Sequence, residues 1–266
     1  MERDHPGFVG DVGHSHPDRG FEMLKNFKEA VRTKDEIVLM NCSIDITRSQ
    51  MEVALGKDDY DAVYFDGQHR PISEEAIVTF CAHAESFGMP VQMRLPHTRQ
   101  VYLAGRFCDF GLSSIMVPEV MEEATVIEAL EYFYYGNLGR RSWGGPNRTG
   151  LGELDDSPDR LEYAAWWNER AVLVLQFESV EAVANAKRLA DRPGIDYVAF
   201  GPNDMAFSLE RHTNFSLRTF EDCFKNVAEQ LDPVGIKRCL AVAIPREERE
   251  KWRALGISIF WGTAEF

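Results

Sequence analysis

The sequence of 266 residues predicts a single (β/α)8 barrel. Eight short runs rich in apolar and β-branched residues recur along the chain, and longer amphipathic segments separate them. This alternation indicates a parallel sheet with crossover helices. The length agrees with the roughly 250 residues of a typical barrel of this kind. No G-x-G-x-x-G motif follows the first run, so an open dinucleotide-binding sheet is not favoured.

The predicted strands begin after residue 35 and continue almost to the end of the chain. They span residues 36–43, 60–66, 90–95, 113–117, 171–177, 195–200, 238–243 and 258–262. Helices are expected between them, at 46–56, 73–87, 98–107, 120–133, 179–191, 216–230 and 246–255. Ser73 and Ser179 are suitable N-caps for two of these helices. An earlier amphipathic segment, residues 21–32, is expected to cover the bottom of the barrel.

Three segments depart from a regular barrel. Residues 1–19 are predicted to be a flexible arm before a barrel of residues 20–266. The arm contains His14 and His16, which could bind a metal, but a solvated arm is favoured because no third ligand is preorganised. Residues 135–165, rich in Gly, Asn and Arg, are expected to form a lid or binding loop. The last predicted strand leaves no room for a complete eighth helix.

Composition restricts the partners of this chain. A formal net charge of −14 argues against nucleic acid or an anionic membrane surface, because both repel an acidic protein. The apolar runs are shorter than the roughly 20 residues that cross a bilayer. Five scattered cysteines without C-x-x-C spacing are typical of reduced thiols, which predicts a cytoplasmic location.

Two acidic residues lie where predicted strands end. Glu178 follows the strand in LVLQFES, and Asp204 follows the strand in AFGPND. The carboxyl ends of parallel strands face one crevice, so the two carboxylates can share a divalent cation. Each also has a structural alternative, because Glu178 suits a helix N-terminus and Asp204 suits a turn.

Further polar residues follow the second and third predicted strands. FDGQHR supplies Asp66, Gln68, His69 and Arg70, and VQMRLPH supplies Arg94. A charge within an apolar strand requires a partner, so Arg94 is either a structural ion-pair residue or an anion binder. His69 could equally be an interior histidine with satisfied hydrogen bonds.

Two other observations limit the chemistry. Asp109, in RFCDFG, would by itself be a surface acid or a helix cap. None of the eight lysines lies at the carboxyl end of a predicted strand, which argues against a Schiff-base aldolase. A carbon–carbon lyase built on this chain would therefore need a metal ion. The lack of a dinucleotide motif likewise indicates no nucleotide cofactor.

Six segments together resemble a known family. They are FDGQH, VQMRLP, CDFGLSSIMVPEV, YYGNLGRRSWGG, LVLQFES and YVAFGPNDMAFSL. In order and spacing they are similar to the motifs of the HpcH/HpaI family of class II, metal-dependent pyruvate aldolases, which includes 4-hydroxy-2-oxoheptanedioate aldolase. The resemblance covers residues 36–266. It differs around residues 40–45 and at Gln68, where many members have glutamate.

The resemblance implies roles for individual residues. Glu178 and Asp204 would bind Mg²⁺, Mn²⁺ or Co²⁺, and pyruvate or its enolate would chelate the same ion. Arg94 would hydrogen-bond a substrate oxygen. His69 would transfer protons, supported by Asp109 and Asp66.

Further substrate contacts are expected beside this machinery. Gln68 and the backbone around Ser114, Gly201 and Pro202 are candidates for contacts with the small acid.

The implied activity is cleavage or formation of a 4-hydroxy-2-oxo acid, giving pyruvate and an aldehyde through a metal-bound enolate. Two alternatives stay open on the same scaffold. One is an oxaloacetate decarboxylase or an enzyme similar to macrophomate synthase, and the other is a barrel that binds a ligand without catalysis. The resemblance also implies a homo-oligomer, either a hexamer or a trimer of dimers.

Overall fold

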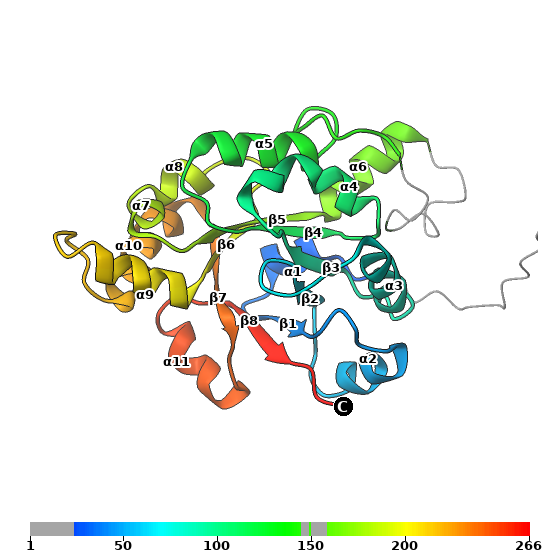
Figure 1. Cartoon of the computed structure of the whole chain (residues 1–266), viewed down its shortest axis with the longest axis horizontal. Helices are drawn as coiled ribbons and strands as arrows, with labels where there is room; N and C mark the ends of the chain where they lie inside the picture. The colour runs from blue at the N-terminus through cyan, green and yellow to red at the C-terminus, as the bar shows by residue number, and fades with distance from the viewer. Residues whose placement is uncertain (1–23, 145–148, 150–158) are drawn as a thin grey trace, which may run out of the picture.

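Eight parallel strands close into one barrel in sequence order, from β1 to β8 (Figure 1). This computed structural model describes residues 24–144, 149 and 159–266. The strands are β1 (Ile37–Asn41), β2 (Ala62–Asp66), β3 (Val91–Arg94), β4 (Ser114–Val117), β5 (Val172–Phe177), β6 (Tyr197–Phe200), β7 (Lys237–Ala243) and β8 (Ile259–Thr263). Both ends of each observed strand lie within two residues of the predicted bounds. The eight strands form a closed parallel barrel, so the predicted fold class is confirmed.

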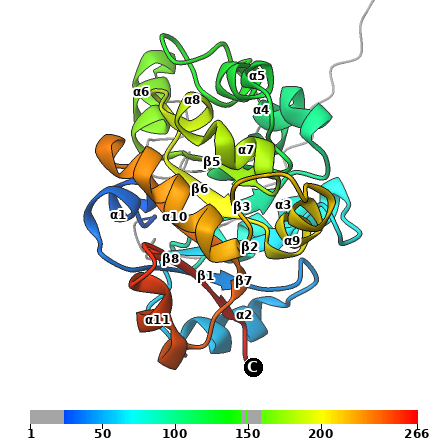
Figure 2. The same cartoon turned by 90° about the vertical axis from the view of Figure 1, so that its left-hand side faces the viewer.

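Helices surround the strands (Figures 1 and 2). They are α1 (Phe27–Thr33), α2 (Arg48–Leu55), α3 (Glu74–Glu85), α4 (Ala104–Cys108), α5 (Glu123–Phe133), α6 (Arg160–Arg170), α7 (Val180–Ala184), α8 (Ala186–Ala190), α9 (Pro202–Arg211), α10 (Phe220–Leu231) and α11 (Arg249–Arg253). Short 3-10 helices occupy Thr98–Leu103, Asp232–Val234 and Arg246–Glu248. Among the described helices, none is both long and apolar enough to cross a membrane.

Two helices lie where the sequence did not predict them. Helix α9 begins at Pro202, directly after β6, where a turn was expected. Proline at the first helical position suits a helix start, because its missing N–H would be unpaired there. Helix α6 occupies the end of the predicted 135–165 loop, and Asp159 caps it by accepting the amides of residues 161 and 162.

The described part of the 135–165 loop packs along the outside of the barrel. Arg140 and Arg141 donate their backbone N–H groups to the carbonyls of Glu131 and Tyr134, next to the end of α5. That helix runs back from the carboxyl ends of the strands, so this contact lies towards their amino ends. These described residues therefore lie away from the carboxyl-terminal rim, and the expected lid or binding loop stays a prediction. Residues 145–148 and 150–158, like the predicted arm 1–19, lie outside the described residues.

Helix α1 closes the amino-terminal end of the barrel. Its Phe27 and Val31 are buried in the same apolar cluster as the inward-facing strand residues Ile37, Leu39 and Val172. The sequence predicted that residues 21–32 would cover the bottom of the barrel, and the described part of that segment confirms it.

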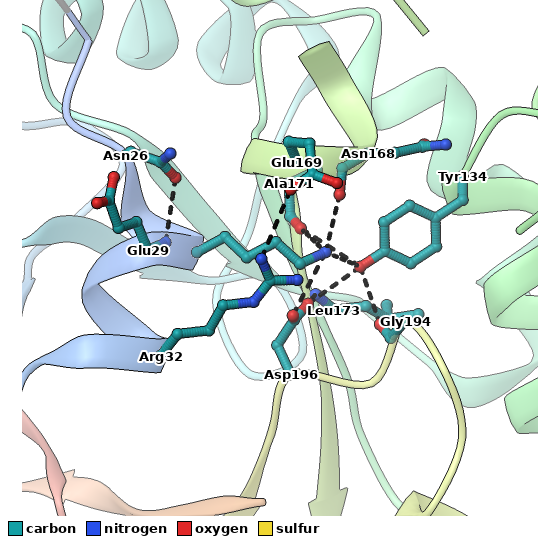
Figure 3. A network of polar contacts seen from close by, with 11 residues as sticks. Asn26, Glu29, Arg32, Tyr134, Asn168, Glu169, Ala171, Leu173, Gly194 and Asp196 are labelled. Carbon is teal, nitrogen blue, oxygen red and sulfur yellow. Dashed lines mark hydrogen bonds and ion pairs between the residues drawn. The ribbon is translucent and has the colours of Figure 1, made fainter. Parts of the chain in front are cut away.

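A buried lysine fastens α1 to the barrel. Figure 3 labels its partners Tyr134, Asn168, Ala171 and Asp196. The ammonium of Lys28 donates to the hydroxyl of Tyr134 and to the carbonyls of Asn168 and Ala171, each at 3.0 Å. It also lies 3.4 Å from the carboxylate of Asp196. Burial lowers the pKa of Lys28 against the raising effect of Asp196, and burial likewise raises the pKa of Asp196. Removing one partner of a buried ion pair leaves the other charge uncompensated, which is strongly destabilising.

We expect Lys28→Met to reduce the free energy of unfolding by about 3–5 kcal/mol, because the Asp196 carboxylate would remain buried without its cation. Chemical denaturation followed by circular dichroism measures this change. Arg32→Met is the matched control on the same helix. The ion pair of Arg32 with Glu169 is exposed, so its loss should change stability by less than about 1 kcal/mol. Equal effects of the two substitutions would contradict the role of Lys28.

Candidate active site

Charged side chains from neighbouring strands meet at the carboxyl-terminal rim of the barrel. Asp66 and Arg94 are the last residues of β2 and β3, and the two are register partners in the sheet. Glu178 directly follows β5, and Asp204 lies in the first turn of α9 after β6. The sequence predicted this convergence, because parallel strands end on one face.

Asp66 holds Arg94 in a fixed orientation. The Nε and Nη2 atoms of Arg94 donate to the two carboxylate oxygens of Asp66 at 2.8 and 2.7 Å, and Nη1 lies 3.4 Å from Oε1 of Gln176. Burial acts to lower the pKa of Arg94, but the bonds to Asp66 outweigh it and the pKa is raised. The same bonds outweigh burial at Asp66 and lower its pKa. Arg94 is therefore an ion-pair residue, and it can also bind an anion, because its guanidinium keeps a positive charge at the rim.

Glu178 is a buried carboxylate with few compensating contacts. Its side chain accepts one backbone N–H, that of Glu119, at 2.9 Å. Burial raises the pKa of Glu178 to about 7, and the nearby charges of Asp204 and Glu119 add to the increase, while the Glu119 amide and Arg94 oppose it. A bound cation would relieve this unfavourable set of like charges.

Gly201 makes the position of Glu178 possible. A Cβ atom on Gly201 would lie 2.1 Å from Oε1 of Glu178, so the carboxylate would have to move. Gly201, predicted as a substrate contact, thus also leaves room for the Glu178 carboxylate.

Asp204 lies in the first turn of a helix instead of in a separate turn. It is exposed in the first turn of α9, and Gly201 at the N-cap makes no side-chain capping bond. The N-terminus of α9 therefore carries backbone N–H groups and a partial positive charge at the rim. Pro202 was also predicted to contact the substrate through its backbone. It has no N–H group, so it cannot donate a backbone hydrogen bond.

The loop after β2 joins the rim through Gln68. Its backbone N–H donates to Asp66 at 2.9 Å, and its side-chain amide donates to Glu119 at 3.1 Å. The Oε1 atom of Gln68 is buried without a hydrogen-bond partner among the described residues. The next residue, His69, is exposed, and its charge contributes to the lowered pKa of Asp66. The interior-histidine alternative is therefore wrong for His69.

Two predicted residues are not brought to this rim. Ser114 begins β4 inside the barrel, where its hydroxyl donates to Oε1 of Gln92 at 2.9 Å. Asp109 ends α4, immediately before the turn into β4, and so lies at the amino-terminal end of the barrel. Its carboxylate accepts a bond from the buried Arg141 at 2.7 Å. The structure shows no hydrogen bond between Asp109 and His69 within this chain, because the two occupy opposite ends of the strands.

Glu119 is a rim residue that the sequence did not single out. It follows β4 with a φ of 50°, the only positive φ of a non-glycine residue in the described part of the chain. This left-handed backbone turns its N–H towards Glu178, and its carboxylate accepts the bond from Gln68. The sequence gives no signal for such a conformation, since glutamate rarely adopts it.

The residues at the rim fit a divalent cation bound by two carboxylates. Among the described residues, no group of three or more His, Cys, Asp or Glu side chains is arranged to hold a metal. Mg²⁺ is commonly bound by one or two protein carboxylates, with substrate and water oxygens completing its shell. Glu178 and Asp204 would supply these two carboxylates. The raised pKa of Glu178 indicates that its ionised carboxylate lacks a compensating positive charge.

A closed parallel barrel with charged residues at its carboxyl-terminal rim is the architecture of the (β/α)8 enzymes. The chain belongs to the HpcH/HpaI aldolase/citrate lyase family, which its sequence matches over residues 45–261. Its relatives are aldolases, so the protein is a carbon–carbon lyase of this family. Class II aldolases of this kind are generally dependent on a divalent metal.

Individual relatives share about a quarter of their residues with the chain. It is 27% identical over 187 residues to 5-keto-4-deoxy-D-glucarate aldolase of Citrobacter koseri, covering 68% of this chain and 70% of the relative. It is 24% identical over 246 residues to hydroxypyruvate/pyruvate aldolase of Paraburkholderia phytofirmans, covering 86% and 91%. The crystal structure of an HpcH/HpaI aldolase from Desulfitobacterium hafniense superposes with a TM-score of 0.75 at 20% identity, over 89% of each chain.

We expect metal-free Glu178→Gln to be more stable than the wild-type protein at pH 8, by on the order of 2–3 kcal/mol. The folded-state pKa of about 7 lies above the ordinary value of 4.5, so ionisation of Glu178 opposes folding. This penalty is absent below pH 4.5, grows as the pH rises towards 7, and is complete above it. Denaturant titrations with a chelator present, at pH 4.5 and pH 8, measure the difference. Equal stability of both proteins at pH 8 would contradict the proposed burial cost.

We expect Gly201→Ala to weaken Mn²⁺ binding by at least about tenfold, because the new methyl group would displace the Glu178 carboxylate. Isothermal titration calorimetry measures the affinity. Gly56→Ala is the control, since its added methyl would meet no atom closer than 3.4 Å. Unchanged Mn²⁺ affinity in Gly201→Ala would show that Glu178 is not a ligand in this position.

Proposed function

We propose that the protein is a divalent-metal-dependent aldolase that cleaves a 4-hydroxy-2-oxo acid into pyruvate and an aldehyde, and catalyses the reverse condensation. The observation that carries this proposal is the buried Glu178 carboxylate, which shares the rim with Arg94 and Asp204. Family membership and the names of the relatives support the reaction class. Mg²⁺, Mn²⁺ and Co²⁺ are the candidate ions.

Glu178 and Asp204 would hold the ion. When bound, a divalent cation acts as a Lewis acid that stabilises the negative charge developing on the oxo acid. Arg94, oriented by Asp66, donates hydrogen bonds to a substrate oxygen on which this charge accumulates. The backbone N–H groups at the start of α9 favour the substrate carboxylate, because the helix N-terminus is electropositive.

His69 is the group proposed to move the proton. In the cleavage direction it accepts the proton of the 4-hydroxyl group, the C4–O bond becomes a carbonyl, and the C3–C4 bond breaks. The electron pair of that bond passes into the enolate of pyruvate, which takes up a proton at C3. His69 is exposed and lies near Asp66 at the rim. Asp109 takes no part in these steps within one chain.

The proposal is tested by proton exchange into pyruvate. With Mg²⁺, Mn²⁺ or Co²⁺ present, the protein should replace the methyl hydrogens of pyruvate by deuterium in D₂O, as observed by proton NMR. Oxaloacetate is offered in parallel. Faster CO₂ release from oxaloacetate than pyruvate formation from 4-hydroxy-2-oxo acids would assign the protein to the decarboxylases instead. A protein without either activity would be a ligand-binding barrel.

We expect Arg94→Ala to lower kcat/KM for cleavage roughly 10²–10³-fold, because a charge-stabilising donor is lost. Arg94→Lys should also be strongly impaired, since an ammonium cannot bond Asp66 through two nitrogens and still face the substrate. Steady-state pyruvate release measures both. Arg106→Ala removes an exposed guanidinium that pairs with Glu74 on the outer surface, and it serves as the control. Full activity of Arg94→Ala would refute the assigned role.

A further inference from the structure

A cavity opens beside the rim residues. It has a volume of about 510 Å³ and lies between the segment that joins β1 to α2, the loop after β2, and the residues that follow β8. In both Figure 1 and Figure 2 the end of the chain after β8 lies beside α2. The volume is within the range of small-molecule sites. Its polar lining includes Asn41, Ser43, Asp45, Arg70 and Thr263.

The cavity is continuous with the candidate active site. Asp66, whose carboxylate binds Arg94, forms part of the cavity wall. Arg70 lines the same cavity and directly follows His69, the proposed proton-transfer residue. A substrate that reacts next to Arg94 and His69 can therefore extend into this space.

Arg70 is a cation that the described structure leaves without an ion pair. Its guanidinium is exposed, although acidic residues are in excess in a protein with a net charge of −14. Of the two carboxylates in the cavity wall, Asp66 is already bound at both oxygens by Arg94. The other, Asp45, is exposed and forms no ion pair with a described residue. A guanidinium available in this way binds carboxylates through two parallel hydrogen bonds.

The remaining polar side chains suit hydroxyl groups. The Asn41 amide and the Thr263 hydroxyl make no side-chain hydrogen bond to another described residue, and the two residues are register partners in β1 and β8. An amide, a hydroxyl and the Asp45 carboxylate together offer both donors and acceptors. The lining also includes apolar residues, namely Cys42, Ile44, Ile46, Ala264 and Phe266. A purely hydrocarbon chain would leave the polar groups of the lining unpaired, which disfavours that ligand.

We propose that this cavity is the subsite for the aldehyde half of the substrate, and that Arg70 selects short, hydroxyl-bearing aldehydes with a carboxylate at the far end. The inference rests on the proposed aldolase function, because it assigns the partner of pyruvate in the same reaction. Asn41, Asp45 and Thr263 contact the hydroxyl groups, and Arg70 contacts the carboxylate.

Pairs of aldehydes that differ in charge but little in size test the proposal. Glyoxylate is compared with glycolaldehyde, and succinic semialdehyde with 4-hydroxybutanal, each in metal-supported condensation with pyruvate. In at least one pair the wild-type protein should show a kcat/KM for the carboxylate-bearing aldehyde at least tenfold above that for the neutral one. Arg70→Gln should reduce that ratio roughly 10–100-fold, mainly through KM, as expected for one charge-assisted contact. Arg70→Lys should retain part of it.

A matched control and a separate assay make the outcomes distinct. Arg48→Gln removes an exposed guanidinium of α2 that pairs with Glu52 and does not line the cavity, so the ratio should stay at its wild-type value. Deuterium exchange into pyruvate needs no aldehyde and tests the proposed function alone. Intact exchange with equal kcat/KM values within both pairs, or with a ratio that Arg70→Gln leaves unchanged, would overturn the subsite. Absence of both exchange and condensation would overturn the proposed function, and the subsite with it.

Discussion

The pairing of β1 with β8 is the interaction on which the rest of this structure depends. Five residue pairs are in register, from Ile37 with Ile259 to Asn41 with Thr263. This pairing joins the first and last strands and leaves no free sheet edge. It also sets Tyr64 and Trp261 in a stacked pair inside the barrel, with ring centroids 4.1 Å apart. Only a closed sheet brings the residues after β8 beside the segment after β1, where the cavity lined by Arg70 lies.

Closure also concentrates negative charge at one rim. The guanidinium of Arg94 pairs with Asp66, and the charges of Asp204 and Glu119 lie near Glu178. Asp66 uses both of its oxygens to hold Arg94, so little of that positive charge is left to neutralise Glu178. The raised pKa of Glu178 is the physical result. A bound divalent cation would offset part of this negative charge, which agrees with the metal dependence of this class of aldolase.

The two ends of the barrel differ in how well their buried charges are compensated. At the amino-terminal end, α1 fills the opening, and Lys28 bonds to Tyr134 after α5, to Asn168 and Ala171 at the end of α6, and to Asp196 just before β6. These contacts are buried and satisfied, as expected where stability is the requirement. At the carboxyl-terminal end, Glu178 is under-compensated and Glu119 has a strained backbone. Strain and unbalanced charge persist at functional sites because the surrounding fold supports them.

The sequence by itself determined the strands and the main rim residues. Apolar runs fix where strands form, and parallel strands must end together, so the residue pattern alone places Arg94, Glu178 and Asp204 on one face. Contacts between distant segments were decided only in three dimensions. Helix α4 runs opposite to the strands and carries Asp109 away from His69. The φ of Glu119 and the space that Gly201 leaves for Glu178 depend on backbone geometry and close packing, which residue patterns along one chain do not encode.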